Sequence, residues 1–392
     1  MTDKMQDEQK NCFDDIRPLT DGELPAAVEM LIANPDFREA FHYIKPDVDW
    51  EEMKRWMRSF KTCGDFRNHL AYAAVMQIAK KTTFSLTISG RSRLPGGAPC
   101  TFLSNHRDIV LDAAFLNVML YDVGYGMTQI AIGDNLLISP WIETVVRLNN
   151  SFIVKRGVSG RQQLEASTKL SAYIRQAVTG KKESIWMAQR EGRAKDSDDK
   201  TQSSILKMLN IGAKDRDKVC QNLMDLNIVP IAISYEYDPC DYLKAKEFQQ
   251  KRDDPAFVKS KRDDLLSMET GILNNKGRVH FSIGSPINPQ LEKLDAALER
   301  NELFSRIAGI IDKEIYKHYR FYPCNYVAYD LLNRCRRFSE RYGAKDKKQF
   351  EDYLQGQLDK IVIPGKDEAY LRGKLLEMYS NPLKNHLENA EE

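Results

Sequence analysis

A polar turn separates an apolar strand from an apolar helix in the stretch Cys100-Thr101-Phe102-Leu103-Ser104-Asn105-His106-Arg107-Asp108-Ile109-Val110-Leu111-Asp112-Ala113-Ala114-Phe115-Leu116. The short apolar run 100–103 is typical of a strand bounded by turns. The run 112–121 predicts a helix. Because α/β proteins place their ligand sites at the ends of strands, the stretch predicts an α/β unit with His106, Asp108 and Asp112 at its functional turn.

The same alternation continues on both sides of this stretch. Apolar runs predict strands at 84–88, 128–132, 151–154, 184–188, 228–235 and 279–283. A helix is expected over 161–178, with Ser159 as its N-cap and Gly180 as its stop. We therefore expect an α/β fold with a mixed, layered sheet flanked by helices.

Both ends of the chain are predicted to be helical. Residues 25–33, 50–60 and 66–81 have apolar side chains at three- and four-residue spacing, and the chain after Pro286 returns to helical patterning. These patterns predict three parts, namely an N-terminal helical region (1–83), a core (84–290) and a C-terminal helical extension (291–392).

The composition excludes several classes of protein. With 58 basic and 56 acidic side chains, the net charge of +2 does not favour binding to nucleic acid. The 7 cysteines contain no C-x-x-C pair, which argues against a disulfide framework or a structural zinc site and predicts a reducing compartment. The polar start of the chain predicts no signal peptide, and no run approaches the roughly 18 apolar residues of a membrane span. We expect a soluble or membrane-peripheral protein.

His106 alone allows two interpretations. A histidine that leaves a strand next to carboxylates can be a general base, because a carboxylate fixes its tautomer and stabilises its charged form. A lone histidine can equally cap a helix or fill a loop.

Three further segments follow predicted strands. Lys155 and Arg156 end the strand 151–154, and arginine suits bidentate contact with phosphate. Glu191-Gly192-Arg193 follows the strand 184–188, and its glycine permits a tight turn toward a ligand. The polar run 194–202 behind it predicts a flexible, solvated loop. Each cationic segment could instead be a solvated strand end, and Val229-Pro230 in the strand 228–235 alone indicates core.

Taken in order, these segments resemble the blocks of the glycerol-3-phosphate and lysophosphatidate acyltransferase superfamily. Asn105-His106-Arg107 resembles the opening of its first block and 152–156 resembles its second. Glu191-Gly192-Arg193 resembles its third and Val229-Pro230-Ile231 its fourth. The segment 131–136 is similar to one found in the glycerol-3-phosphate branch.

The resemblance implies transfer of an acyl group from acyl carrier protein or coenzyme A to a hydroxyl of a glycerol-phosphate or related lipid acceptor, in phospholipid synthesis. It implies that His106 is the base, that an aspartate orients it, and that Lys155, Arg156 and Arg193, with Glu191 and Gly192, form the acceptor site. It implies no metal and no redox cofactor. It also places the protein in the cytoplasm, peripherally at the inner face of a membrane.

The sequence departs from the family pattern in two places. The family aspartate lies five residues after the histidine, where this chain has Leu111. Asp112 lies one residue beyond the family position, and Asp108 lies closer to the histidine. We favour Asp112 as the partner of His106 because it stands at the start of an apolar helix, and Asp108 remains the alternative. Gln189-Arg190 replaces the usual apolar lead of the third block, which leaves the acceptor open.

Other functions are also conceivable. His106-Arg107-Asp108 is how a protein-kinase catalytic loop begins, but the asparagine expected five residues after the aspartate is Ala113, and no Asp-Phe-Gly follows. A non-catalytic lipid-binding protein on the same fold is the better alternative. The aromatic and basic tail 313–342 could meet anionic lipid or pack on the core with a solvated basic face, and packing is favoured.

Overall fold

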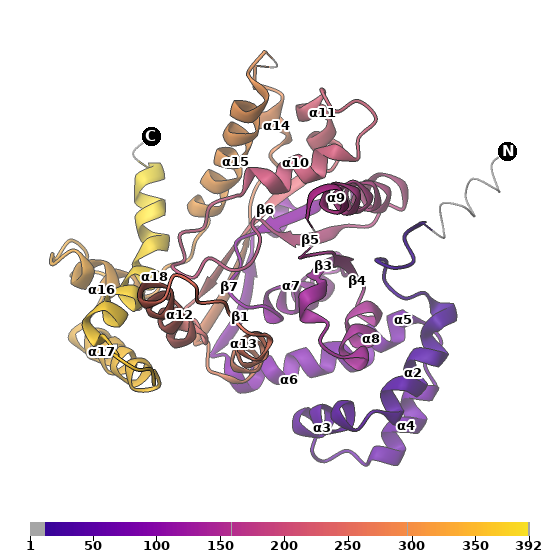
Figure 1. The fold of residues 1–392 in the computed structure, drawn as a ribbon, viewed down its shortest axis with the longest axis horizontal. Helices are drawn as coiled ribbons and strands as arrows, with labels where there is room; N and C mark the ends of the chain where they lie inside the picture. Colours follow the sequence, from indigo (N-terminus) through magenta and orange to yellow (C-terminus); the bar gives the residue numbers. More distant parts are fainter. Residues whose placement is uncertain (1–11, 158, 296, 391–392) are drawn as a thin grey trace.

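The computed structural model describes residues 12–157, 159–295 and 297–390, and their centre is a seven-stranded sheet (Figure 1). Its strands lie in the order β1-β7-β6-β2-β5-β3-β4, and only the β6–β7 pair is antiparallel. Five strands therefore run one way, and β1 and β7 run the other way at one edge. The strands are β1 (Ser85–Ser89), β2 (Thr101–Ser104), β3 (Gln129–Gly133), β4 (Ser151–Val154), β5 (Ile185–Ala188), β6 (Ile228–Tyr235) and β7 (Arg278–Ile283).

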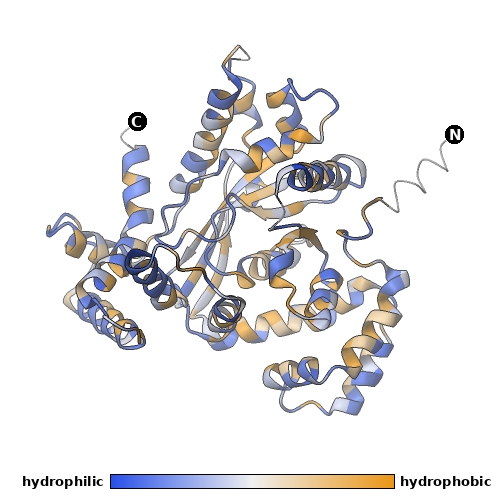
Figure 2. Cartoon of the chain, in the orientation of Figure 1, coloured by the Kyte–Doolittle hydropathy of each residue, from blue (hydrophilic) through white to orange (hydrophobic). Residues whose placement is uncertain are grey.

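Helices cover both faces of the sheet because alternate strand residues point to opposite sides. On β2, Phe102 joins a core with α6 and α7, whereas Leu103 joins a core with α9, α10 and α15. The helices of this central part are α6 (Tyr72–Thr82), α7 (Leu111–Asp122), α8 (Pro140–Leu148), α9 (Gly160–Arg175), α10 (Ser203–Ile211), α11 (Val219–Met224), α12 (Asp241–Asp253), α13 (Lys261–Leu273), α14 (Asn288–Leu291) and α15 (Arg300–Lys317). Figure 2 shows the apolar residues concentrated in the sheet and on the helix faces turned toward it.

The two ends of the chain form smaller apolar clusters of their own. The N-terminal cluster is built from α2 (Leu24–Ala33), α3 (Pro35–Ile44) and α4 (Trp50–Arg58), and Leu148 of α8 packs into it. The C-terminal cluster is built from α16 (Pro323–Leu332), α17 (Ala344–Asp359) and α18 (Glu368–Ala390), together with residues of α12. A short helix, α5 (Cys63–Asp65), and four brief turns of 3-10 or π helix, η1 (Asp21–Glu23), η2 (Phe66–Ala71), η3 (Arg91–Arg93) and η4 (Asp134–Leu136), connect these elements.

The predicted fold class is confirmed, including the helical regions at both ends. The strands β4 and β6 have the predicted bounds, β1, β2 and β3 are each shifted by one residue, and β5 and β7 differ by one residue at their first end. The predicted helix 161–178 ends as a π-helical turn, η5 (Gln176–Gly180). The division of the chain at 83/84 and 290/291 stays a prediction. None of the helices within the described ranges is long and apolar enough to cross a membrane.

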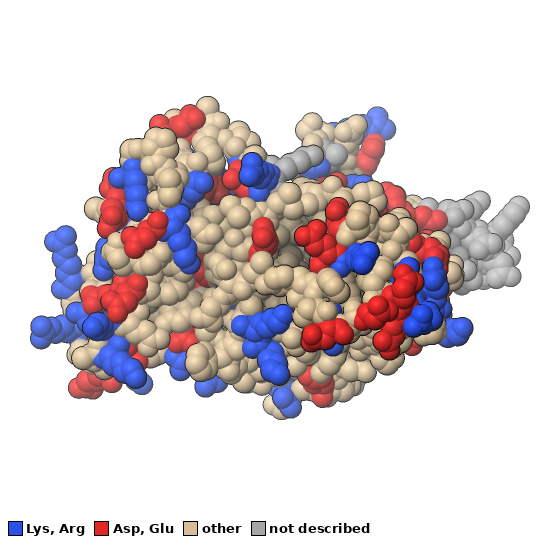
Figure 3. Space-filling view, turned by 90° about the horizontal axis from the view of Figure 1, so that it is seen from below, with Lys and Arg blue, Asp and Glu red and all other residues tan. Residues whose placement is uncertain are grey.

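The segments 194–202 and 313–342 are both more buried than a solvated surface segment would be. The prediction of a solvated loop over 194–202 is wrong, because Ser197, Asp199 and Thr201 are buried. In the aromatic and basic tail, Tyr316, Tyr319 and Tyr322 are buried, whereas the cations after α16 are exposed, so the tail packs on the core as favoured. In Figure 3, basic side chains stand out at the end of the molecule where Figure 1 places α16 and α17.

Candidate active site

The turn between β2 and α7 brings His106 against a buried carboxylate. Nδ1 of His106 lies 2.8 Å from Oδ2 of Asp112, a side chain that is fully buried in the first turn of α7. An ionised carboxylate only accepts hydrogen bonds, so the imidazole donates from Nδ1 and its Nε2 carries the lone pair. The remaining exposure of the ring, 13 %, is toward the pockets described below.

Asp108 has a different role in the same turn. Its Oδ1 accepts the backbone N–H groups of Val110 and Leu111, at 2.9 and 2.7 Å, and so closes the start of α7. Its Oδ2 faces Gly271 on α13, where a Cβ atom would lie only 2.1 Å from that oxygen. Burial, reinforced by the nearby Asp112 charge, raises the pKa of Asp108. The structure thus brings Asp112, and not Asp108, to the imidazole.

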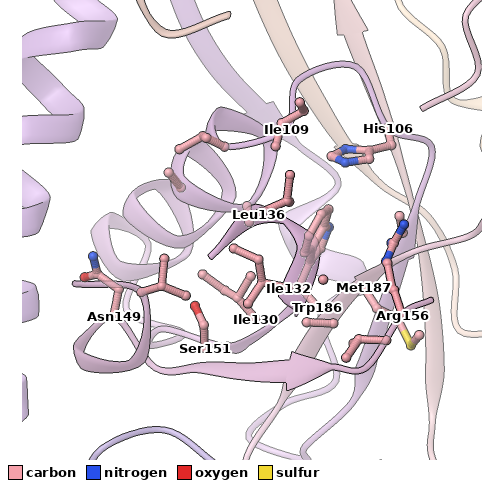
Figure 4. A pocket seen from close by; sticks show the side chains of 18 of the residues that line it. His106, Ile109, Ile130, Ile132, Leu136, Asn149, Ser151, Arg156, Trp186 and Met187 are labelled. Carbon is pink, nitrogen blue, oxygen red and sulfur yellow. The ribbon is translucent and has the colours of Figure 1, made fainter. Parts of the chain in front are cut away.

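An apolar cavity of about 580 Å³ begins at His106. The ring of Trp186 meets the imidazole edge to face at 5.7 Å, and its Nε1 donates to Ser104. Figure 4 shows His106 and Arg156 at one end of the cavity and Asn149 and Ser151 at the other. Apolar side chains line the space between these ends, among them Ala113, Val118, Ile130, Ile132, Leu136, Val145, Met187 and Met208.

A second, polar pocket of about 510 Å³ opens on the other side of His106. Its walls come from the segment after β5 and from α12 and α13, and they contain more cations than carboxylates. Both pockets share His106, Ile109, Leu136, Arg156, Arg190, Glu191 and Gly192. The imidazole therefore stands at the junction of an apolar space and a cationic one.

The predicted cationic residues near this junction differ in how deeply they are buried and in which pocket they line. Arg156 is half-buried, its backbone N–H donates to Asp134, and its guanidinium lies 3.4 Å from Glu191. Gly133 makes this placement possible, because a Cβ there would lie 2.6 Å from Nε of Arg156. Arg193 lines the polar pocket, whereas Lys155 is exposed at the wall of the apolar cavity. Gly192 turns the chain with a φ of +68°, in the left-handed region that favours glycine.

Three arginine N–H groups at this junction are buried without a hydrogen-bond partner. They are Nε of Arg156, Nε of Arg190 and Nη1 of Arg193. Buried donors are costly to leave unpaired, so such a group favours binding of an anion. Sequence reasoning did not assign Arg190 to the site. Its only signal was a cation two residues after β5, at one of the two places where the sequence departs from the pattern that it resembles.

Tyr235, which follows Val229-Pro230-Ile231 in the segment that resembles the fourth block, ends β6 and was given no role in the site. Burial raises the pKa of its hydroxyl well above the usual value, and the Asp112 carboxylate beside it acts in the same direction. The fourth predicted block thus supplies a neighbour for the aspartate. Within the described ranges, no group of three or more His, Cys, Asp or Glu side chains could hold a metal ion.

Comparison with known proteins gives a family match for the part of the chain that contains this site. Residues 85–234 match the Acyltransferase family. The match runs from β1 almost to the end of β6, so it includes His106, Asp112 and the arginines of the junction but neither helical end. Among solved structures, the 1-acyl-sn-glycerophosphate (LPA) acyltransferase PlsC from Thermotoga maritima is similar. It is 11% identical, the comparison covers 76% of this chain and 97% of that chain, and the TM-score is 0.34. No curated protein gives a significant match.

Proposed function

We propose that the protein transfers a fatty acyl group from an acyl thioester to a hydroxyl of a glycerol-phosphate or related lipid acceptor, in membrane lipid synthesis. One observation carries the proposal: His106, paired with the buried Asp112, stands where an apolar cavity meets a pocket with unpaired arginine donors. The match of residues 85–234 to the Acyltransferase family supports it.

The proposed chemistry uses His106 as a general base. Nε2 takes the proton of the acceptor hydroxyl while its oxygen attacks the thioester carbonyl carbon. Asp112 accepts from Nδ1 and stabilises the resulting imidazolium. The tetrahedral intermediate then collapses, the carbon–sulfur bond breaks, and the imidazolium returns its proton to the thiolate. Products are an ester and a free thiol, and the base is restored.

In this proposal each pocket binds a different substrate. The acyl chain occupies the apolar cavity, because each buried methylene group contributes roughly 0.8 kcal/mol. The acceptor phosphate binds the unpaired N–H groups of Arg156, Arg190 and Arg193. Both reacting atoms then meet at His106, and such prepositioning lowers the barrier further.

We favour glycerol-3-phosphate as the acceptor. The segment 131–136, which is similar to that branch, forms part of the wall around the junction: Asn135 lines the polar pocket and Asp134 holds the backbone of Arg156. The donor is an acyl carrier protein or a coenzyme A thioester.

We also infer a peripheral contact with the cytoplasmic face of a membrane. Val258 and Leu265 are 83% and 42% exposed, beside Phe257 and Leu266, which line the polar pocket. Exposed apolar side chains at a pocket mouth suit the headgroup level of a bilayer. Vesicle flotation tests this inference: Val258→Asp with Leu265→Asp should reduce the bound fraction, and equal flotation of the variant and the wild type would contradict it.

The function is tested with purified full-length protein. Long-chain thioesters of acyl carrier protein and of coenzyme A are offered with glycerol-3-phosphate, its 1-acyl product or glycerol. We expect transfer to glycerol-3-phosphate and a loss of at least about 10³-fold in His106→Asn. The matched control is His42→Asn, because His42 is exposed on α3. Full activity in His106→Asn would overturn the mechanism. Tight binding of acyl lipid without transfer to any acceptor would favour the non-catalytic alternative.

A further inference from the structure

One buried carboxylate binds both neighbours of His106 in the chain. Asp199 accepts a bidentate pair of hydrogen bonds from the Arg107 guanidinium, at 3.0 and 2.6 Å, and a third bond from the Asn105 amide at 3.3 Å. Arg107 and Asp199 are both almost fully buried. Burial alone would lower the pKa of Arg107, but the charge of Asp199 more than offsets this, and the pKa is held above its usual value. The guanidinium therefore stays charged, and its two hydrogen bonds to one carboxylate fix the relative position of the two side chains.

The other side of Asn105 is bound to the sheet. Its Oδ1 accepts the N–H of Ile233 at 2.8 Å, and its Nδ2 donates to the Ile233 carbonyl at 2.9 Å. The turn that presents His106 is thus fixed between β6 and Asp199. Asp112 binds the imidazole itself, so the side chain of each residue from 105 to 107 is held by a hydrogen bond.

Asp199 is held in turn by two tyrosines of the C-terminal helical extension. The Tyr319 hydroxyl donates to Oδ2 of Asp199, and the Tyr316 hydroxyl donates to its backbone carbonyl at 2.5 Å. Asp312 on α15 accepts from the N–H and the hydroxyl of Thr201, at 2.8 and 2.6 Å.

The last helix holds the same segment from its other end. Asn381 on α18 donates to the carbonyl of Asp196 at 2.8 Å, and Asn385 donates to the carboxylate of Asp198 at 3.2 Å. The segment 194–202 is therefore a fixed bridge between the catalytic turn and the C-terminal extension. This extension lies outside the residues that match the Acyltransferase family.

We propose that Asp199 is a positioning residue for His106, and that the C-terminal extension completes the catalytic turn through Tyr319. The proposal rests on the proposed function of His106. It assigns to the extension a role in catalysis that its sequence does not indicate.

Two matched tyrosine variants separate positioning from simple support of the fold. Tyr319→Phe removes a hydrogen bond to the Asp199 carboxylate, and Tyr316→Phe removes one to the backbone of the same residue. A purely structural role predicts similar effects from both. Positioning predicts that Tyr319→Phe lowers kcat about 3- to 10-fold with KM unchanged within about twofold, whereas Tyr316→Phe changes neither by more than about twofold. Asp199→Asn is expected to lower kcat about 10- to 100-fold.

A second measurement does not depend on acyl transfer. In protein labelled with ¹⁵N-histidine, long-range ¹H–¹⁵N spectra report which ring nitrogen carries the proton, and His106→Asn assigns the signal. We expect a single Nδ1–H tautomer in the wild type and in Tyr316→Phe, and mixed or broadened signals in Asp199→Asn and Tyr319→Phe.

These readouts separate the possible failures. Unchanged His106 signals and unchanged kcat in folded Asp199→Asn and Tyr319→Phe would overturn the inference. If Asp199→Asn does not fold, Tyr319→Phe against Tyr316→Phe decides alone. If the wild type transfers no acyl group, the proposed function fails, and the spectra still test whether Asp199 positions His106.

Discussion

Oδ2 of Asp112 accepts from His106 and also from the backbone of the turn that carries His106. Besides the imidazole at 2.8 Å, it accepts the N–H groups of Arg107 and Asp108 at 2.6 and 3.0 Å. Three donors on one oxygen fix the carboxylate without help from solvent, because the side chain is fully buried. The ring is therefore held in one tautomer before any substrate arrives.

Asp112→Asn should abolish most of the activity while the fold is retained. The amide still fits the site, but it carries no charge to stabilise the imidazolium. We expect kcat to fall about 10²- to 10⁴-fold, as for removal of a base-orienting carboxylate. Steady-state kinetics measure this effect, and thermal unfolding shows whether the variant is folded.

Asp108→Asn is the matched control for this variant. The asparagine oxygen can still accept from Val110 and Leu111, and Asp108 does not contact the imidazole. We expect less than about a threefold change in kcat. A larger loss in Asp108→Asn than in Asp112→Asn would reverse the assignment of the two aspartates.

The arginines at the junction should determine affinity for the phosphorylated acceptor. A charge-assisted hydrogen bond contributes about 1.5 to 3 kcal/mol, so Arg156→Met, Arg190→Met and Arg193→Met should each raise KM for that acceptor about 10- to 100-fold. The control is Lys155→Met, because Lys155 is exposed and should matter less. Assays with glycerol, which lacks the phosphate, should show no difference between Arg190→Met and the wild type. Equal losses with both acceptors would argue against phosphate binding.

Local patterns predicted much of the fold and part of the site. Continuous apolar runs predicted β4 and β6 with their bounds because both strands are buried along almost their whole length. The position of His106 after β2 was likewise predicted. The choice between Asp108 and Asp112 could only be favoured, because it depends on α7 beginning at Leu111, which the spacing of residues leaves open by one position.

Contacts between distant residues could not be predicted in this way. The segment 194–202 is polar and was expected in solvent, yet its partners Asp312 and Tyr319 come from more than 100 residues away. Polar residues that satisfy one another inside a protein have the same composition as a solvated loop. In the same way, a sequence shows that Arg190 is charged but not that its Nε is buried without a partner.

The far end of the apolar cavity should limit the length of the acyl chain. Ser151 is buried at the end opposite His106 (Figure 4). Ser151→Leu adds bulk there, so we expect kcat/KM for the longest saturated donors to fall several-fold while shorter donors change little. Ser151→Ala keeps the cavity length and is the control. A uniform loss over all chain lengths would indicate damage to the sheet instead.

The mostly buried Asp312 should make stability depend on pH, with a sign that can be worked out. Burial raises its pKa to about 7, although the hydrogen bonds from Thr201 oppose the shift. An unfolded aspartate titrates near roughly 4. Between these two values the folded state binds more protons than the unfolded state, so the contribution of Asp312 to the free energy of unfolding decreases as pH rises from 4 to 7. The penalty is complete above pH 7 and absent below pH 4.

Asp312→Asn removes this titration while an oxygen can still accept from Thr201. The free energy of unfolding of the variant should equal or fall below that of the wild type at pH 4. Relative to the wild type, the variant should become more stable up to pH 8 by on the order of 4 kcal/mol, since the pKa shift is about three units and each unit corresponds to about 1.4 kcal/mol. Urea unfolding at pH 4, 5, 6, 7 and 8 measures the difference, in which the titration of the other carboxylates cancels. If the difference in free energy of unfolding between the variant and the wild type stayed constant over this range, burial would not raise the pKa of Asp312 in the folded protein. The hydrogen bonds from Thr201 would then be accepted by a charged carboxylate over most of this range.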